Sequence, residues 1–298
     1  MNKINGFLFL VFLFPSLAFA DEPLDLDQVV VTATRTPMSL EDSLAPTLVI
    51  SRAEIERSQA TDIAELLRFH AGIDIGRNGG PGQTTSVFVR GTESNHTLVL
   101  IDGIEMNPGT LGGAAIQNVP VESIERIEIV KGPRSSLYGS EAIGGVINII
   151  TRQPTGELQV TANAGAGSFG SRRIGASVLK ANKKLNVGFT AGFFDTDGFP
   201  ARQGSTQDRG HDNQNINFRI GSHFSDTAVE FRFWQTQGNT EYSGFFLEPL
   251  DQDFLNRVSA LESGNQISES WESNISLPPL EEDIAQTQAN CRGDFDCV

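Results

Sequence analysis

Four carboxylates in one long polar stretch are the side chains of this sequence best suited to binding chemistry. The segments "DTDG" and "QDRGHDNQN" contribute Asp195, Asp197, Asp208 and Asp212. Calcium takes six to eight oxygen ligands, often from several carboxylates and carbonyls, so these four residues are candidate calcium ligands. Arg209 and His211 add positive or potentially positive charge among them, and the EF-hand's closing Glu is missing. A solvated acidic turn is the competing interpretation.

Catalytic motifs are missing from the sequence. It contains no G-x-x-x-x-G-K-[ST], no H-E-x-x-H, no G-x-S-x-G and no C-x-x-C. The Gly-rich run 132–145 lacks the Lys of a phosphate-binding loop, and the histidines are scattered along the chain. We therefore expect no enzymatic activity and no required cofactor, with calcium as the one candidate ion.

The first twenty residues have the pattern of an export signal. Lys3 precedes the apolar run "INGFLFLVFLFPSLAFA", which closes with Ala18-Phe19-Ala20, an A-x-A cleavage site. A membrane-anchoring helix is the alternative, but the run is short and Pro15 interrupts it. We expect residues 1–20 to be a signal peptide and the mature protein to leave the cytoplasm.

Charge and cysteine content agree with an exported protein that does not bind nucleic acid. The formal net charge is -15, with 37 acidic and 22 basic residues, whereas nucleic-acid binding depends on Lys and Arg. Cys291 and Cys297 are the only cysteines. In an oxidising compartment they are a candidate disulfide, with two unpaired thiols as the alternative.

Residues 40–153 have the pattern of a compact α+β domain. In "SRAEIERSQATDIAELLRFHAG", Ser51 and Glu54 have capping-box spacing, Ile63, Leu66 and Leu67 share one helical face, and a Gly ends the run. This predicts one helix. The segments "SVFVRG", "TLVLID", "IERIEIV" and "GGVINIITR" predict strands, and two of them are apolar enough to be buried on both faces. The Gly-rich loops between them are either ligand-contacting loops or plain surface turns.

Residues 154–298 instead alternate between apolar and polar side chains. In "AVEFRFW", Phe231 and Phe233 face one side while Glu230 and Arg232 face the other. Segments of about ten such residues, joined alternately by short turns and long loops, are typical of membrane β-barrels. We count roughly six strands and the start of a seventh, with strands at 266–277 and 284–291 and a long loop before them. A soluble β-sandwich is the alternative.

A β-prone heptad precedes both parts, within residues 21–39. "DQVVVTA" is rich in β-branched residues and free of proline. No hairpin turn nearby offers it a partner strand. Such a segment suits pairing with the sheet edge of another protein. The alternative is that it folds back on its own domain.

The motifs "SVFVRGTESNHTLVLIDGIEMN" and "GPRSSLYGSEAIGGVINII" closely resemble the plug domain of TonB-dependent outer-membrane transporters. The resemblance implies an α+β plug domain followed by the first strands of an antiparallel transmembrane β-barrel. It also implies an outer-membrane location in contact with lipid. A barrel of about 22 strands has a lumen that a separate domain must plug. Because roughly seven strands are far fewer than 22, we expect the chain to be truncated.

Within this family, the resemblance implies the partners and the site residues. The heptad matches the TonB box, which pairs with the periplasmic C-terminal domain of TonB and consists of Asp27, Gln28, Val29, Val30, Val31, Thr32 and Ala33. The plug loops are most similar to those of cobalamin (vitamin B12) receptors, which also bind calcium in an external loop. The implied ligand-binding residues are Asn78, Gln83, Thr84, Thr85, Asn107, Thr110 and Leu111.

The sequence thus predicts energy-coupled uptake of a large, scarce ligand, with cobalamin as the first candidate. A ferric siderophore or haem is the alternative ligand, because related receptors share much of the same plug. A binding module that does not transport is the remaining alternative. The TonB-box-like segment distinguishes a transporter from a passive binding module, since a passive module needs no energy coupling.

Overall fold

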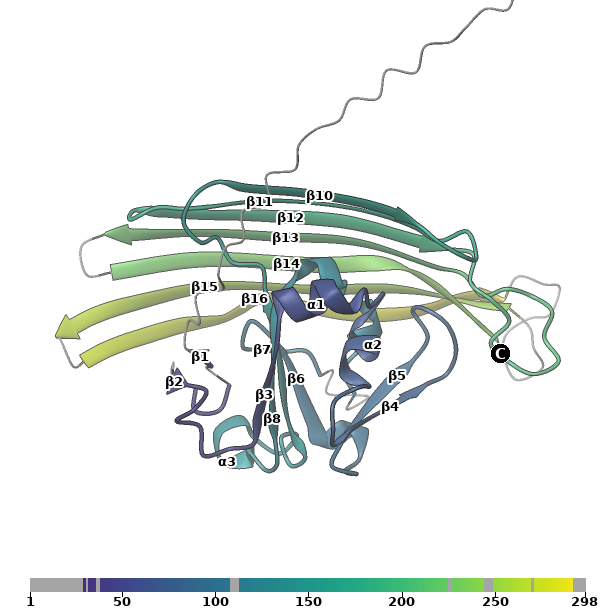
Figure 1. Cartoon of the computed structure of the whole chain (residues 1–298), viewed down its shortest axis with the longest axis horizontal. Coiled ribbons are helices and arrows are strands. Elements are labelled where there is room, and N and C mark those ends of the chain that lie inside the picture. The colour runs from purple at the N-terminus through teal and green to yellow at the C-terminus, as the bar shows by residue number, and fades with distance from the viewer. Residues whose placement is uncertain are drawn as a thin grey trace, which may run out of the picture.

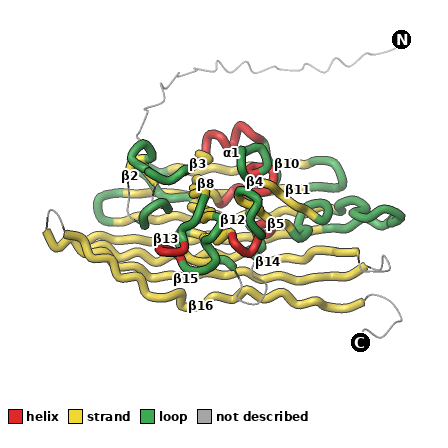
Figure 2. The backbone as a smooth tube through the Cα atoms, turned by 90° about the horizontal axis from the view of Figure 1, so that it is seen from below, coloured by secondary structure: helices red, strands yellow, loops and turns green. Residues whose placement is uncertain are grey.

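The computed structural model describes residues 29–30, 32–35, 38–107, 113–224, 227–243, 249–268 and 271–291. They form a plug domain packed against one face of a long, curved antiparallel sheet, which we call the wall (Figure 1). Seen from below, the plug lies over the middle of the wall strands (Figure 2). Among the described residues, no helix has the length and apolar character needed to cross a bilayer.

The plug is built on a five-stranded mixed sheet in which only β6 and β9 are parallel neighbours. Its order is β3 (Thr47–Ser51), β8 (Ile124–Lys131), β9 (Gly145–Thr151), β6 (Thr97–Ile101) and β7 (Ile104–Glu105). A separate hairpin pairs β4 (Ile73–Arg77) with β5 (Thr85–Val89). Four of these strands lie where the apolar segments predicted them, which confirms the α+β plug.

The predicted single helix is wrong, because the chain forms two short helices. α1 (Arg52–Ser58) begins as expected, with the Ser51 hydroxyl accepting a hydrogen bond from the backbone N–H of Glu54. It ends at Gln59, which has the left-handed φ of 53°. Asp62 then caps α2 (Ile63–Leu67). The shorter elements are α3 (Ser135–Tyr138), η1 (Ser94–His96), η2 (Ile116–Asn118) and η3 (Val121–Ser123).

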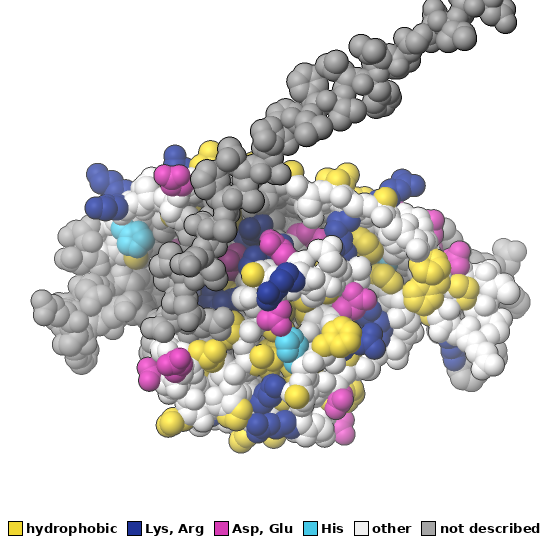
Figure 3. Space-filling model, in the orientation of Figure 1, with side chains coloured by type: hydrophobic (Ala, Val, Ile, Leu, Met, Phe, Trp, Pro, Cys, Tyr) yellow, Lys and Arg dark blue, Asp and Glu magenta, His cyan; other side chains and the backbone are white. Residues whose placement is uncertain are grey.

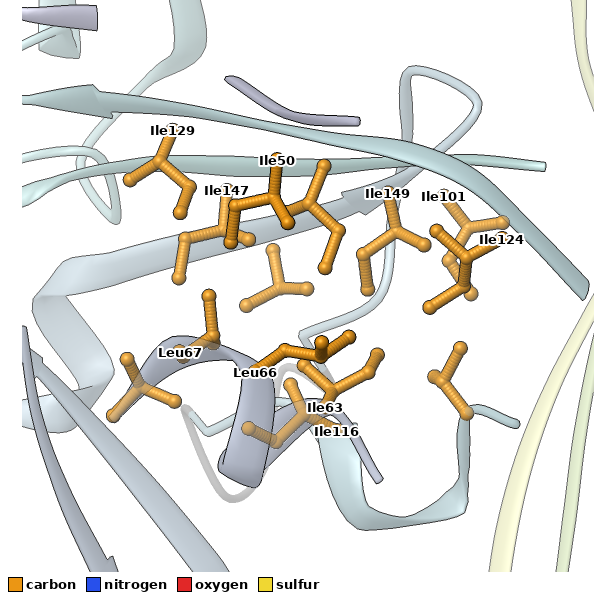
Figure 4. Packing of buried hydrophobic residues seen from close by; sticks show 14 of the residues in the cluster. Ile50, Ile63, Leu66, Leu67, Ile101, Ile116, Ile124, Ile129, Ile147 and Ile149 are labelled. Carbon is orange, nitrogen blue, oxygen red and sulfur yellow. The ribbon is translucent and has the colours of Figure 1, made fainter. Parts of the chain in front are cut away.

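Branched aliphatic side chains fill the space between the plug sheet and the helices. Ile50, Ile129 and Ile147 come from three neighbouring strands and face Leu66 and Leu67 of α2 (Figure 4). Ile, Val and Leu suit this place because their branched side chains pack well on a pleated surface. The same cluster continues into the wall through Trp234 and Val258, so plug and wall share one core.

The wall is a meander in which each strand pairs with the next along the chain. Its seven strands lie in sequence order. They are β10 (Gln159–Ala166), β11 (Arg172–Ala181), β12 (Leu185–Thr196), β13 (His211–Phe224), β14 (Thr227–Ser243), β15 (Pro249–Ser268) and β16 (Trp271–Cys291). Among the described residues, β10 and β16 are the two edges.

Alternation along the wall is confirmed. In β13, Ile216 and Ile220 are 43% and 39% exposed on the outer face, whereas Asn217 and Arg219 are buried against the plug. An apolar outer face and a polar inner face are what a membrane barrel strand requires. The fold is therefore a plug followed by antiparallel strands of a barrel.

Of the two predicted last strands, the one at 284–291 lies within β16, whereas the one at 266–277 is misplaced. Residues 266–277, expected to be one strand, span the turn between β15 and β16, and most of the expected long loop belongs to β15. β15 does not alternate clearly: polar Asn256 lies between buried Phe254 and Val258, and Asp253 and Arg257 flank Leu255 on the opposite face. Pro278 and Pro279 follow directly after the expected strand 266–277, but they lie at a bulge between the pairs Ser259–Glu281 and Leu261–Leu277. A bulge tolerates proline because its residues leave the ladder.

Candidate functional site

The β-prone segment near the N-terminus is docked on the plug. Its strand β1 (Val29–Val30) pairs antiparallel with β2 (Met38–Ser39). Thr32 and Ala33 of the predicted TonB box are buried. Asp27, Gln28 and Val31 lie outside the described residues. The strand thus folds back on its own chain, which was the alternative to pairing with a partner.

Thr32 anchors this segment to a buried carboxylate on β8, the strand between β3 and β9. The backbone N–H and the hydroxyl of Thr32 both donate to Oε2 of Glu128, at 2.9 and 2.7 Å. The other oxygen of Glu128 accepts from Arg126, with Nε and Nη2 at 2.9 and 2.8 Å. Glu128 is fully buried, so both of its oxygens have lost water and depend on these donors.

Two more plug side chains complete the anchor. Asn148 donates from Nδ2 to the Thr32 hydroxyl at 3.0 Å, and the Tyr138 hydroxyl donates to the Thr32 carbonyl at 3.0 Å. Burial raises the pKa of Tyr138 above its ordinary 10.0, and the nearby positive charge of Arg35 partly opposes this. The guanidinium of Arg35 also lies over the Tyr138 ring, 4.5 Å from its centroid.

Asn148 also connects the anchor to the wall through the turn between β6 and β7. Its Oδ1 accepts from the backbone N–H of Gly103 at 3.1 Å. Asp102 and Gly103 have φ of 49° and 83°, as an Asp-Gly hairpin turn of type I′ requires. This turn presents the Asp102 carboxylate, whose Oδ2 accepts from Arg219 of β13 at 3.0 Å.

The ion pair between Asp102 and Arg219 belongs to a larger buried network. Arg219 also pairs with Glu230 at 3.0 Å, and Arg232 donates to the Asp102 carbonyl at 3.0 Å. Arg232 also pairs with Glu262 of β15. Both arginines lie on the inner face of the wall, and for Arg232 this confirms the alternation predicted for "AVEFRFW". A continuous set of hydrogen bonds therefore runs from Thr32 through the plug to three wall strands.

The first predicted ligand-binding loop lies at the end of the wall that carries the long loops. The side chain of Gln83 is buried and donates to the Glu241 carbonyl at 2.7 Å, while Tyr242 donates to the Gly82 carbonyl. Thr85 is also buried, and its hydroxyl donates to the Gln83 carbonyl. The side chains of Gln83 and Thr85 thus hold the loop, whereas those of Asn78 and Thr84 are exposed.

The second predicted loop is represented by Asn107. Its Oδ1 accepts from the backbone N–H of Val99 at 3.0 Å, and its amide donates to the Thr97 carbonyl at 3.3 Å. This buried side chain extends the edge of β6, which differs from the expected ligand-facing position. Thr110 and Leu111 lie outside the described residues.

The four candidate calcium ligands do not converge. Asp195 of β12 and Asp212 of β13 are directly opposite each other across the two strands, while Asp197 and Asp208 lie beyond the strand ends. Among the described residues, no group of three or more His, Cys, Asp or Glu side chains is arranged to hold a metal ion. Calcium binding stays a prediction.

Two further predictions lie outside the described residues. The signal peptide, residues 1–20, is one of them. The other is the disulfide between Cys291 and Cys297, because the structure describes the chain only as far as residue 291.

Sequence reasoning missed Glu128 and Asp102, the two carboxylates that organise the site. Glu128 lies in "IERIEIV", where its position between two isoleucines of a strand buried on both faces was the available signal. Asp102 lies in the "LIDG" turn, which marked it as a turn residue only. Its partner in the wall, Arg219, is more than a hundred positions away in the sequence.

The plug has a recognisable sequence as well as a recognisable fold. A family model described as "TonB-dependent Receptor Plug Domain" matches residues 39–146. A curated relative from Photobacterium profundum, described as "Vitamin B12 transporter BtuB", is 38% identical over 242 residues. That match covers 80% of this chain and 40% of the relative, so the chain spans less than half of the relative's length.

Solved structures share the arrangement of plug and wall. The pyoverdine-bound FpvA of P. aeruginosa superposes with a TM-score of 0.72 at 16% identity, covering 83% of this chain and 35% of FpvA. The siderophore receptor PirA of Acinetobacter baumannii gives a TM-score of 0.62 at 22% identity, covering 77% of this chain and 39% of PirA. At these identities the likeness shows the fold alone. Together with the plug match and the related sequence, it places the chain in the TonB-dependent receptor family.

Proposed function

We propose that this chain belongs to a receptor for TonB-dependent uptake of cobalamin across the bacterial outer membrane. The observation that carries the proposal is the docked segment. A β-prone terminal segment is held by one threonine on a buried carboxylate and is paired by two residues of its own chain. A strand paired over only two described residue pairs can be exchanged for an added strand from TonB.

The coupling role follows from the hydrogen-bond chemistry of the anchor. Strand pairing uses backbone N–H and C=O groups, so β2 occupies an edge of β1 that an added strand could use. Pairing with the C-terminal domain of TonB on that edge would require β1 to leave β2. Pulling on the segment would then act on Glu128 and, through Asn148, on the turn that contacts the wall.

The ligand is proposed on two grounds. The Photobacterium relative is described as a vitamin B12 transporter. The exposed loop side chains Asn78 and Thr84 carry an amide and a hydroxyl, which suit a neutral, amide-bearing corrinoid. The receptor would bind and move the ligand unchanged, and the apolar outer face of the wall would contact outer-membrane lipid.

The test requires a closed barrel, so we define a completed receptor. It joins this chain, after β14, to the remaining barrel strands of the Photobacterium relative. Cells whose only cobalamin receptor is this protein should take up radiolabelled cyanocobalamin when TonB is present and lose uptake when it is absent. Uptake of ferric siderophores in place of cobalamin would overturn the ligand, and uptake without TonB would overturn the coupling.

Changes at Glu128 test the anchor. Glu128→Gln removes the charge that Thr32 and Arg126 share, so the segment should undock more often and trypsin should cleave faster at the exposed Arg35. Glu125→Gln on the same strand is the control, since Glu125 lies 3.8 Å from Arg152 and does not contact Thr32. Equal cleavage of both variants would contradict a docked segment held by Glu128.

A further inference from the structure

Lysine is concentrated at one turn of the wall. Three of the five lysines in the chain, Lys180, Lys183 and Lys184, lie at the turn between β11 and β12. The side chains of all three are exposed. The other two short turns of the wall, residues 225–226 and 269–270, contain one acidic residue each and no Lys or Arg. Solvation of a short turn therefore does not explain the lysines, since two other turns at the same end of the wall do without positive charge.

Hydrogen bonds fix the backbone that carries these lysines. The side-chain oxygen of Asn182 accepts from the backbone N–H groups of Lys184 and Leu185, both at 2.9 Å. The backbone N–H of Asn182 donates to the Leu185 carbonyl at 2.9 Å. The Lys184 carbonyl accepts from the backbone N–H of His223 at 3.0 Å and from the Ser222 hydroxyl at 2.9 Å. The turn is thus held within itself and against β13, so the three lysines extend from one fixed segment.

The described residues form no ion pair with these three ammonium groups. The ion pairs of the described residues involve arginines and one histidine only. The backbone N–H of Ala181 donates to the Gly156 carbonyl at 2.9 Å, which brings the exposed Glu157 near the turn without an ion pair. Like charges held near one another repel, and an anion shared by them removes this repulsion. The turn is therefore suited to binding an anionic group.

Lys180 ends the apolar outer row of β11. Side chains alternate along a strand, so Lys180 shares the outer face with Val178 and Ile174, which are 42% and 61% exposed. Arg172 is the other end of this row, at the start of β11. The apolar part between the two cations spans about 27 Å along the strand. This is comparable with the apolar band of about 25 Å on outer-membrane barrels, so Lys180 lies at one rim of the band.

The rim that carries the lysines is the one that faces the periplasm. Short turns of outer-membrane barrels lie on the periplasmic side, and β1 and β2 lie toward the same end of the wall (Figure 1). Leu185 and Phe224 flank the turn on the outer face and are 42% and 67% exposed. Aromatic side chains in such positions mark the membrane interface. A lysine can lay its apolar stem along this surface and hold its ammonium at the level of the lipid headgroups.

We propose that Lys180, Lys183 and Lys184 bind the phosphate of an anionic phospholipid in the periplasmic leaflet of the outer membrane. Leu185 and Phe224 then contact its acyl chains. The inference rests on the outer-membrane location proposed above and adds a lipid site on the outside of the wall. A lipid fits better than an acidic protein, because Lys180 continues a row of lipid-facing side chains. A water-soluble partner would have to displace lipid to reach it.

The first experiment measures which lipid contacts the turn. Leu185→Trp in the completed receptor, reconstituted in bilayers, places an indole beside the lysines, and phospholipids with brominated acyl chains quench its fluorescence. Phosphatidylglycerol should half-quench this indole at an about fivefold lower mole fraction than phosphatidylethanolamine with the same chains, because only phosphatidylglycerol has a net negative charge. Phe193→Trp, on the outer face near the other end of β12, is the matched control and should show no such preference. The receptor without an added Trp supplies the background.

The second experiment tests whether the lysines cause the preference. In the Leu185→Trp protein, changing Lys180, Lys183 and Lys184 together to Gln should abolish the preference, whereas changing them to Arg should keep it. About 1 M NaCl should reduce it in the lysine form, since charge interactions are then screened within about 3 Å. Equal quenching by the two lipids in the lysine form, or an unchanged preference in the Gln variant, would overturn the site. Loss of the preference in millimolar inorganic phosphate would also overturn it, because the turn would then hold a free ion.

Failure of this proposal and failure of the proposed function are distinguishable. The quenching measurements contain no cobalamin and no TonB, whereas uptake by the unmodified completed receptor reports on both. A receptor that takes up cobalamin but shows no lipid preference at Leu185→Trp would overturn the lipid site alone.

Discussion

At the scale of single residues, Val29 tests whether β1 is the strand that pairs with TonB. Val29→Pro removes a backbone donor and fixes φ, so β1 should no longer pair with an added strand. Uptake of cyanocobalamin should stop while cell-surface binding remains, because the ligand loops lie elsewhere. Val29→Ile keeps the N–H and the β-branched side chain and should transport normally. Normal transport by the proline variant would show that this segment is not the coupling strand.

Tyr138 predicts a pH dependence of docking. Only the protonated phenol can donate to the Thr32 carbonyl. Because burial raises the pKa of Tyr138 in the folded state, its contribution to stability is complete below pH 10.0. That contribution declines as the pH rises through the higher folded-state pKa. Trypsin cleavage at Arg35 should therefore accelerate above pH 10 more in the parent protein than in Tyr138→Phe, compared at pH values where trypsin activity is calibrated. Parallel pH profiles would contradict this role.

At the scale of elements, the turn between β6 and β7 joins the plug to the wall. Asp102→Ala should lower the free energy of unfolding by about 3 kcal/mol, because it leaves the buried Arg219 with one carboxylate fewer and removes two bonds to Thr151. Glu56→Gln is the control, since Glu56 on α1 is exposed and its pair with Arg52 should contribute less than about 1 kcal/mol. Urea unfolding of the completed receptor measures both. Equal losses of stability in the two variants would show that the network does not hold the plug against the wall.

The elements also show how far the sequence could predict this molecule. Strands β5, β6, β8 and β9 were predictable because each is a short apolar run bounded by turn residues. The break between α1 and α2 was not, because Gln59 in a left-handed conformation has no sequence pattern as specific as glycine. β15 was missed because polar and apolar side chains occur on both of its faces, which leaves no clear alternation in its sequence.

The candidate site was predictable in outline only. Thr32 and the loop around Gln83 were found by their resemblance to a family motif. Their contacts were not, since Thr32 meets Glu128 and Gln83 meets the Glu241 carbonyl through pairings distant in sequence. Gln83 and Asn107 have amides that a sequence motif assigns to a ligand, yet both are used to hold backbone. Only tertiary structure separates these two uses of one side chain.

At the scale of the whole molecule, the plug and the wall share a core through Trp234. This side chain is 3% exposed and packs with the plug cluster. Trp234→Ala should cost about 3–5 kcal/mol of stability by leaving a large cavity between the two parts. Phe189→Ala, at a wall position 43% exposed on the outer face, should cost much less. Thermal unfolding followed by far-UV circular dichroism compares the stability of the two variants. Similar losses of stability would argue against a shared core.

Charge is distributed without a single dominant patch on the plug face of the molecule. Figure 3 shows Lys and Arg side chains interspersed there with Asp and Glu side chains and with apolar ones. This mixed distribution agrees with a plug that contacts the wall through specific ion pairs, such as Asp102–Arg219 and Glu122–Arg173.

The order of strands in the two sheets has a consequence for the rate at which each part forms. In the wall, every ladder joins consecutive strands, and the hairpin from Ala181 to Asn186 closes a very short loop. In the plug, Thr47 pairs with Val130, far away in the sequence, and β8 lies between β6 and its partner β9 along the chain. Loop closure over long separations slows folding, so nucleation should be fast in the wall hairpins and slow in the plug sheet.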